Sequence, residues 1–208
     1  MTAHSVEKIG GTSMSRFDEL LPNLIIGDGA GEDLYRRCFV VSAFGGITNL
    51  LLEDKKTGEP GVYGLFAGGE SGHAWADALD RVADAMVDHN RRLLSDAGDR
   101  QVADTFVRER VEGARSCLID LQRICAYGHF QIEEHLMTIR ELLAGLGEAH
   151  SAHTATLMLR RADVNARFVD LSGWRDEHHP SLDERITGAL AGIDLSSEMP
   201  VVTGYAQT

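Results

Sequence analysis

The first quarter of the chain alternates short β-favouring runs with pairs of glycine residues. Residues 5–9 (SVEKI) lead directly into a glycine pair at 10–11, and residues 38–43 (CFVVSA) lead into a second pair at 45–46. Apolar and β-branched runs of this length are typical of strands, and paired glycines are typical of tight turns. Good helix formers then follow at residues 47–53 (ITNLLLE). The pattern therefore predicts two units of strand, glycine turn and helix.

From residue 74 to about residue 162 the apolar positions recur at steps of three and four, which predicts a long helical block. We expect breaks at residues 96–99, near residues 127–128 and at residues 145–147, giving roughly four helices of ordinary length. The apolar positions form three sets: Leu79, Val82, Ala83, Met86, Leu93 and Leu94; Val107, Val111, Leu118 and Leu121; and Ile132, Leu136, Ile139 and Leu143.

Two more strands are predicted near the end of the chain. Residues 164–171 (VNARFVDL) alternate apolar and polar side chains, and residues 199–202 (MPVV) end shortly before a glycine. Residues 172–183 read as a loop, and residues 62–66 as part of a loop or a short hairpin. We therefore expect one α/β domain with a mainly parallel sheet, helices on both faces and a large helical insertion at about 74–146.

The charge and composition of the chain argue against some classes of binding partner. The 208 residues carry 32 acidic and 20 basic side chains, a formal net charge of -12, without a cluster of Lys and Arg. Nucleic acid and anionic membranes are therefore not expected as partners. No apolar run approaches the ~20 residues of a membrane helix, and we expect a cytoplasmic protein. Cys38, Cys117 and Cys125 have no CxxC spacing and are expected to be packed free thiols.

The first glycine turn carries groups that suit a polyphosphate. Residues 8–13 (KIGGTS) place one ammonium, two backbone amides without side chains and two hydroxyl groups in a single turn. The chain lacks a GxxxxGK(S/T) phosphate loop, which argues against a P-loop nucleotidase. A lone KxGG fits a sharp turn with a surface lysine equally well, so the second glycine turn is needed to favour phosphate chemistry.

The two glycine turns together resemble the aspartate kinases of the amino acid kinase family. Residues 6–13 (VEKIGGTS) match the amino-terminal pattern V-x-K-(F/Y)-G-G-(S/T)-S except at Ile9. Residues 41–50 (VSAFGGITNL) are similar to the pattern V-S-A-x-G-G-x-T-(N/D)-x-L. Residues 147–151 resemble a G-E-x-x-S helix start, residues 163–170 (DVNARFVD) the strand D-V-x-A-x-(W/F)-x-D, and residues 201–205 (VVTGY) a later strand end. The motifs leave residues 58–146 uncovered.

This resemblance implies transfer of the γ-phosphoryl group of ATP to the β-carboxylate of L-aspartate, with Mg²⁺ on the phosphates. Lys8 would be the catalytic cation. It would also contact the ATP phosphates, together with Gly10, Gly11, Ser13, Ser42, Gly45 and Gly46. Ser13 fits a helix cap equally well.

For L-aspartate the resemblance implies Glu148 at the ammonium, Thr48 at a carboxylate and Tyr205 in the pocket; Tyr205 fits simple packing equally well. No protein metal site is expected, because the nine histidines match neither HExxH nor HxxEH. His150 and His153 stand one helical turn apart, but core-edge histidines are the simpler reading.

The resemblance also implies what lies outside these residues. Aspartate kinases continue with a G-R-G-G-S-D-type segment, a pocket for the nucleotide base and regulatory ACT domains, none of which this sequence resembles. We therefore expect an amino-terminal part of a kinase that is a homodimer or larger homo-oligomer at full length, within lysine, threonine and methionine or ectoine biosynthesis. Two alternatives stay open: another acceptor such as glutamate or acetylglutamate, and a non-catalytic dimerisation or regulatory module.

Overall fold

A four-stranded parallel sheet is the centre of the fold. The computed structural model describes residues 4–27, 29, 34–69, 73–176, 178 and 180–207. Among these residues the strands lie in the order β1-β2-β4-β3, and every neighbouring pair is parallel. The α/β class and the parallel sheet predicted from the sequence are therefore confirmed. The strands are β1 (Ser5–Ile9), β2 (Arg37–Val41), β3 (Ala166–Val169) and β4 (Met199–Thr203).

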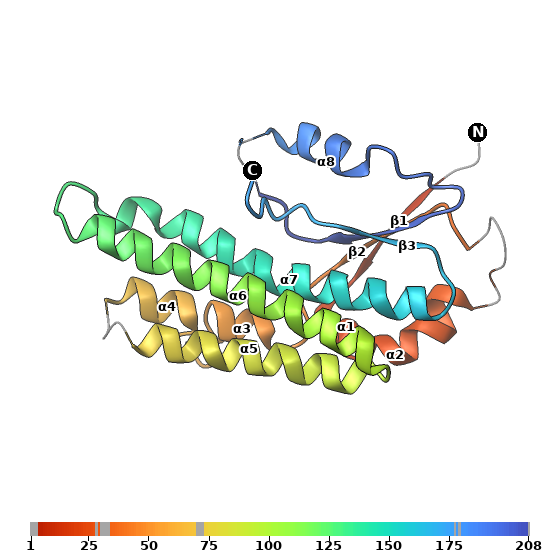
Figure 1. Cartoon of the computed structure of the whole chain (residues 1–208), viewed down its shortest axis with the longest axis horizontal. Coiled ribbons are helices and arrows are strands. Elements are labelled where there is room, and N and C mark those ends of the chain that lie inside the picture. Colours follow the sequence, from red (N-terminus) through yellow and green to blue (C-terminus); the bar gives the residue numbers. More distant parts are fainter. Residues whose placement is uncertain are drawn as a thin grey trace.

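Helices cover both faces of this sheet, as expected. The chain moves in one direction across the sheet from β1 to β2 to β3, and then steps back to β4. Because crossovers between parallel strands are right-handed, the step back must place its helix on the opposite face. That helix is α8 (Leu182–Leu190), which lies across the sheet from α7 (Figure 1). The side chains of Ser181 and Glu184 start α8 with a capping box.

The helices before β3 pack on the other face. Three long helices lie side by side there (Figure 1), and Asp96 starts the second of them by accepting from the amides of Gly98 (2.8 Å) and Asp99 (3.0 Å). The elements on this side are α1 (Gly11–Met14), α2 (Phe17–Leu20), a π-helical segment (Leu21–Ile26), α3 (Ile47–Leu51), α4 (Val62–Ala67), α5 (Ala74–Leu93), α6 (Ala97–Cys125), a 3₁₀ turn (Ile132–His135) and α7 (Leu136–Arg161).

The two faces have cores of different size. The larger core joins Phe39, Val41 and Val201 of the strands to the long helices, including Trp75 and Leu143. A smaller core beneath α8 contains Val169, Leu171 and Val202. The long helices therefore form the main hydrophobic core, and α8 closes the opposite face. None of the helices in the described ranges combines the length and apolarity that crossing a membrane requires.

Two elements differ from the sequence prediction. The expected break at residues 145–147 is wrong, because α7 runs unbroken through both glycines. A Cβ on Gly147 would lie 2.9 Å from Cβ of Ala43, and a Cβ on Gly145 would lie 2.9 Å from Cβ of Ser172. These glycines let α7 approach its neighbours, and the contact outweighs the low helix propensity of glycine.

The expected loop or hairpin at residues 62–66 is also wrong. These residues form helix α4, and a single antiparallel bridge from Glu53 to Pro60 closes the preceding loop. Val62 and Phe66, four positions apart, are almost fully buried in the larger core. Burial of one helical face thus decides the conformation despite the nearby glycines.

The cysteines are free thiols, as predicted, but they are not all packed. Cys117 and Cys125 both lie on α6; Cys117 is exposed and Cys125 is half-buried. The expected core packing is therefore wrong for Cys117. Cys38 is half-buried beside β4, and burial raises the pKa of its thiol.

Candidate phosphate and amino acid site

The two glycine bends lie against each other at the carboxyl ends of β1 and β2. The strands pair in parallel with Lys8 opposite Val40, so they end level, and the amide of Ser42 donates to the carbonyl of Ile9 (3.0 Å). A Cβ on Gly11 would lie 2.7 Å from the carbonyl oxygen of Ala43. Only glycine fits at position 11, because the two bends are in direct backbone contact there.

A serine hydroxyl joins the two bends. The Oγ of Ser15 accepts from the amide of Gly45 (2.8 Å) and donates to the carbonyl of Gly11 (3.2 Å). Gly46 follows with φ at +89°, in the left-handed region that favours glycine, and α3 begins after it. The role of Ser15 was not predicted from the sequence, because one of its two partners is 30 positions away.

Glu148 brings a carboxyl group to the same end of the sheet. It lies on α7 beside Gly204, where a Cβ would stand 3.1 Å from its Oε2, and this buried oxygen has no hydrogen-bond partner among the described residues. Burial raises the pKa of Glu148 to about 7, although a backbone hydrogen bond from Tyr205 and the charge of Lys8 both act to lower the pKa. The carboxyl group is thus poised to accept a cationic or hydrogen-bonding partner.

α7 is fixed directly to the second bend. The hydroxyl of Ser151 donates to the carbonyl of Ser42 (2.8 Å), which holds the carboxyl end of β2 against this helix. Gly147, one residue before Glu148, leaves room for Ala43 and Ile47 to pack on the helix backbone. The G-E-x-x-S pattern therefore has a local explanation: the glycine permits approach, the serine fixes the strand end, and the glutamate between them faces the bends.

Two predicted site residues lie on the helices that follow the bends. Ser13 is exposed inside α1 and lines a surface hollow with Thr12 and Arg16. Its alternative role as a helix cap is wrong, because α1 is capped at Gly10 and α2 at Arg16. Thr48 is half-buried in the first turn of α3, directly after the second bend. Contacts of either hydroxyl with a ligand stay a prediction.

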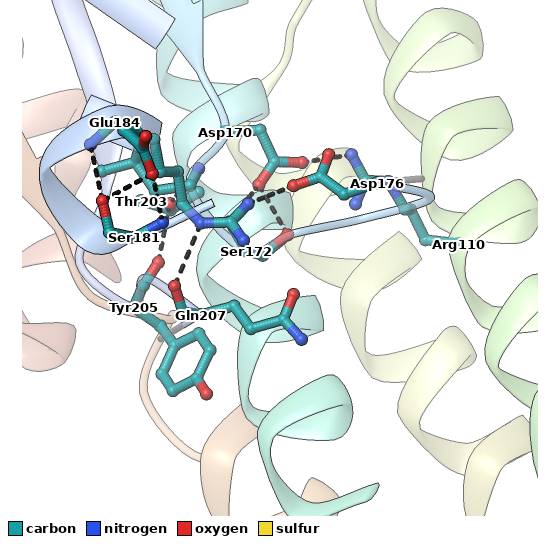
Figure 2. Close-up of polar contacts among 11 residues, drawn as sticks. Arg110, Asp170, Ser172, Asp176, Ser181, Glu184, Thr203, Tyr205 and Gln207 are labelled. Carbon is teal, nitrogen blue, oxygen red and sulfur yellow. Dashed lines mark hydrogen bonds and ion pairs between the residues drawn. The ribbon is translucent and has the colours of Figure 1, made fainter. Parts of the chain in front are cut away.

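Tyr205 is placed by a polar network at the ends of β3 and β4, which Figure 2 shows. The hydroxyl of Thr203 donates to the carbonyl of Tyr205 (2.9 Å) and accepts from the amide of Leu171 (2.9 Å). The ring of Tyr205 points away from this network in Figure 2. Burial, together with the carboxylate of Glu141, raises the pKa of Tyr205 to about 12. Tyr205 thus offers its backbone amide to Glu148 and its ring to α7.

The same network ties α8 and α6 to the strand ends. Arg185 donates to the carbonyl of Gln207 (3.0 Å) and forms an ion pair with Asp176. Asp170, which accepts from the amide of Ser172 (2.9 Å), is paired with Arg110 of α6. The loops on the site side of β3 and β4 are therefore held by side chains from both faces of the sheet.

The histidines of α7 pack in the helical layer. His150 is 1% exposed and its Nε2 lies 2.8 Å from Oδ1 of Asn90, while His153 stacks on Phe106 with ring centroids 4.1 Å apart. Burial lowers the pKa of His150 to about 3 and that of His153 to about 4, so both are neutral. Within the described part of the chain, no three His, Cys, Asp or Glu side chains are grouped as a metal site would require.

Comparisons with known proteins support the resemblance seen in the glycine motifs. The chain is 52% identical over 202 residues to aspartate kinase Ask_Ect of Stutzerimonas stutzeri (strain A1501), a match covering 97% of this chain and 42% of that protein. In structure it is similar to E. coli aspartokinase III in complex with aspartate and ADP (R-state), with a TM-score of 0.51 and 20% identity over 95% of this chain and 40% of that one. No protein-family model matches the chain.

The match includes the helical region that the glycine motifs leave uncovered, because it extends over 97% of the chain. The chain spans less than half the length of both relatives. At 20% identity, the solved structure supports the fold alone, whereas the sequence match is specific. Almost the whole of this chain therefore corresponds to a part of an aspartate kinase, which confirms the resemblance to that family.

Proposed function

We propose that this chain forms the phosphate-binding and aspartate-binding bends of an aspartate kinase. The complete enzyme would transfer the γ-phosphoryl group of ATP to the β-carboxylate of L-aspartate, giving 4-phospho-L-aspartate. The observation that carries this proposal is the convergence of two glycine bends with Lys8 and Glu148 at one end of a parallel sheet, where Oε2 of Glu148 has no hydrogen-bond partner within the described part of the chain. Ligands of open α/β sheets bind at this end.

The phosphate half of the site would consist of Lys8, the glycine bends and the neighbouring hydroxyl groups. Lys8 is exposed at the end of β1, where its ammonium can act as a point charge on a phosphate. Gly10 and Gly45 are exposed, and Gly46 is exposed with a left-handed backbone, so phosphate oxygens can approach the main chain. We assign Ser13 and Ser42 to the edge of this cradle.

The amino acid half would consist of Glu148, Thr48 and Tyr205. An ammonium group on the open Oε2 of Glu148 would replace the hydration that burial removes, and would hold the carboxylate ionised. Thr48 can donate its hydroxyl to a carboxylate of the same ligand. Crystals of E. coli aspartokinase III in complex with aspartate and ADP support this choice of ligands.

The chemical step is a direct displacement at phosphorus. One oxygen of the β-carboxylate forms a bond to the γ-phosphorus while the bond to the β,γ-bridging oxygen breaks, and ADP leaves with the electron pair. A carboxylate is already a competent nucleophile, so the enzyme mainly aligns the groups and stabilises the charge on the transferred phosphoryl group. Lys8 would supply that stabilisation. We place Mg²⁺ on the triphosphate, where this ion ordinarily binds in kinases.

Several finer predictions accompany this proposal. We regard residues 1–208 as the amino-terminal part of a kinase domain, with the helical insertion at about 74–146 and with the nucleotide-base half and ACT domains elsewhere. A homo-oligomeric full-length enzyme, a cytoplasmic location and a role in lysine, threonine and methionine or ectoine synthesis stay predictions. This segment alone should have negligible kinase activity, since displacing a substrate by about 1 Å can cost ~100-fold in rate.

Calorimetric titration of the 208-residue chain tests the proposal. Lys8→Ala should weaken binding of Mg²⁺-tripolyphosphate by roughly ten- to hundredfold, the value of a charge-assisted contact. Glu148→Gln should weaken binding of L-aspartate in the same range. Lys55→Ala, in the exposed loop before α4, is the matched control and should change neither.

Unchanged polyphosphate binding in Lys8→Ala, or no binding by the unaltered chain, would contradict the phosphate site. The acceptor is tested separately on the full-length enzyme with L-aspartate, L-glutamate and N-acetyl-L-glutamate. Faster phosphorylation of either of the last two would favour another member of the amino acid kinase family.

A further inference from the structure

The first helix of the insertion touches both glycine bends at once. Nη2 of Arg92, near the end of α5, lies 3.2 Å from the carbonyl oxygen of Ser15, which follows the first bend. The backbone of Gly45, in the second bend, lies next to His89 of the same helix and acts to raise the pKa of its ring. Residues 77 positions apart are thus brought together by one turn of α5.

The protonation of His89 follows from its neighbours. Nη2 of Arg92 lies 2.8 Å from Nδ1 of His89. Because a guanidinium can only donate, Nδ1 must accept and the ring proton must be on Nε2, where it can be donated to the carbonyl of Gly45. Burial and the charge of Arg92 lower the pKa of His89, which favours this neutral form, although the bond to Gly45 and the carboxylate of Asp88 act in the opposite direction.

The ring of His89 also supports the second bend by stacking. It lies nearly parallel to the ring of Phe44, with centroids 4.8 Å apart and an interplanar angle of 14°. Phe44 also makes an edge contact with His150, with ring centroids 5.1 Å apart. Phe44 is 1% exposed, so the residue directly before Gly45 is held between histidines of α5 and α7.

These contacts close into a ring of four residues. Arg92 donates to Ser15 and to His89; His89 contacts Gly45; and the amide of Gly45 donates to Oγ of Ser15 (2.8 Å). Three of the four links join different segments among the first bend, the second bend and α5, and the fourth, from Arg92 to His89, lies within α5. A change in the spacing of the bends would therefore break at least one of these bonds.

α5 is itself fixed against the helix that carries Glu148. Asn90, next to His89, is fully buried; its amide donates to Asp104 of α6 (2.9 Å), and its oxygen accepts from Thr154 of α7 (2.9 Å) and contacts His150 of α7 (2.8 Å). α5 therefore holds the two bends against the same layer of helices that carries the carboxyl group of Glu148.

We propose that His89 and Arg92 are positioning residues that set the spacing between the two glycine bends for a bound polyphosphate. This inference rests on the proposed function, and it gives the helical insertion a role as the support behind the phosphate site. A ligand that contacts both bends requires their geometry to within about 0.5 Å, which glycine-rich backbone does not maintain by itself. Neither side chain needs to touch the ligand to have this effect.

Three substitutions on α5 test the inference, with Mg²⁺-tripolyphosphate as the probe. His89→Phe keeps a ring against Phe44 but removes the polar contacts with Arg92 and Gly45, and Arg92→Ala removes the link to Ser15. Each should weaken binding about five- to tenfold, the value of one or two hydrogen bonds. His89→Gln, whose amide keeps a donor and an acceptor, should recover most of the loss. Arg91→Ala is the matched control, because Arg91 pairs with Asp88 on the exposed side of the same helix (2.7 Å).

A second readout separates positioning from stability. In the unaltered chain, the probe should shift the amide NMR signals of Gly10, Gly11, Gly45 and Gly46 together. In His89→Phe and Arg92→Ala, the signals of one bend should lose most of their response, while the thermal midpoint stays close to that of Arg91→Ala.

The outcomes distinguish this inference from the proposed function. Full binding and coupled shifts in both variants, with weak binding in Lys8→Ala, would overturn the positioning role and leave the phosphate site intact. Full binding in Lys8→Ala as well would overturn both. Losses that follow the thermal midpoint, or that His89→Gln fails to reverse, would show a structural role only and would also overturn the inference.

Discussion

Two side chains of α7, only two positions apart, lie in opposite kinds of surroundings. Glu148 lies beside Gly204 at the carboxyl end of the sheet, where its buried Oε2 has no partner among the described residues and burial raises the carboxyl pKa to about 7. His150 faces α5, where burial lowers its pKa to about 3 and Asn90 binds its Nε2. The helical layer thus keeps His150 neutral and bonded through Nε2, although its buried Nδ1 has no partner among the described residues, whereas the carboxyl group of Glu148 lies where a ligand could complete it.

The helical layer shows what a region built for stability looks like. Asn90 is completely buried, yet each of its side-chain polar atoms is bonded, to Asp104 on one side and to His150 and Thr154 on the other. Such a network ties together three helices that could otherwise slide along their apolar faces. Removal of one side chain from this network should cost a large part of its stabilising free energy, because the polar groups that lose their partner stay buried.

Removing the centre of this network should have the largest effect on stability. Asn90→Ala leaves polar atoms of Asp104, His150 and Thr154 without their partner, and we expect a loss of about 3 kcal/mol in the free energy of unfolding. Urea denaturation of the 208-residue chain measures it. Asn23→Ala, which removes one bond from an exposed asparagine to the carbonyl of Glu19 (2.8 Å), should cost less than about 0.5 kcal/mol. Equal losses in the two variants would contradict the difference between a buried network and an exposed contact.

The contact between the two regions is tested by adding one methyl group. Gly147→Ala would place Cβ 2.9 Å from Ala43 and 3.1 Å from Ile47, and it should cost about 2 kcal/mol by pushing α7 from the second bend. Gly188→Ala, in α8, meets nothing within 4 Å and should stabilise the chain by about 0.5–1 kcal/mol through helix propensity alone. Thermal unfolding of both variants checks the signs. Stabilisation by both would mean that α7 does not approach the bend so closely.

The features that the sequence predicts best are those determined by residues close together along the chain. Strand β1 has the predicted bounds of residues 5–9, and the glycine pairs end β1 and begin the helix after β2, because strand propensity and turn chemistry act over a few residues. Local signals fail at residues 62–66 and 145–147, where burial of Val62 and Phe66 and the close approach of α7 to Ala43 are decided by distant parts of the chain.

The candidate site shows the same difference between local signals and contacts from distant parts of the chain. Lys8, the two bends and Glu148 are readable from motifs because each motif is contiguous. Ser15, His89 and Arg92 were missed, since their contacts with the bends span 30 positions for Ser15 and 77 for Arg92. The spacing of four residues from Gly11 to Ser15, the residue after α1, is the one signal that could have suggested a hydroxyl near the first bend. Nothing in the periodicity of α5 distinguishes His89 and Arg92 from other polar positions on that helix.

The smallest effect on stability, and the sharpest test of the contrast along α7, should come from Glu148→Gln. At pH 8 the unaltered carboxyl group is ionised and poorly solvated, so the neutral amide should raise the free energy of unfolding by about 1 kcal/mol, allowing for the remaining solvent exposure. The folded pKa of about 7 lies above the ordinary 4.5, so the folded state holds more protons between these values and its stability falls as the pH rises through this window. At pH 4, below both values, Glu148 is neutral in the folded state and mostly neutral in the unfolded state, so the difference should almost disappear. Urea denaturation at the two pH values measures it, and L-aspartate binding should be weakened in the same variant. A gain that persists at pH 4, or a loss at pH 8, would show that Glu148 is already satisfied within the fold and is not kept for a ligand.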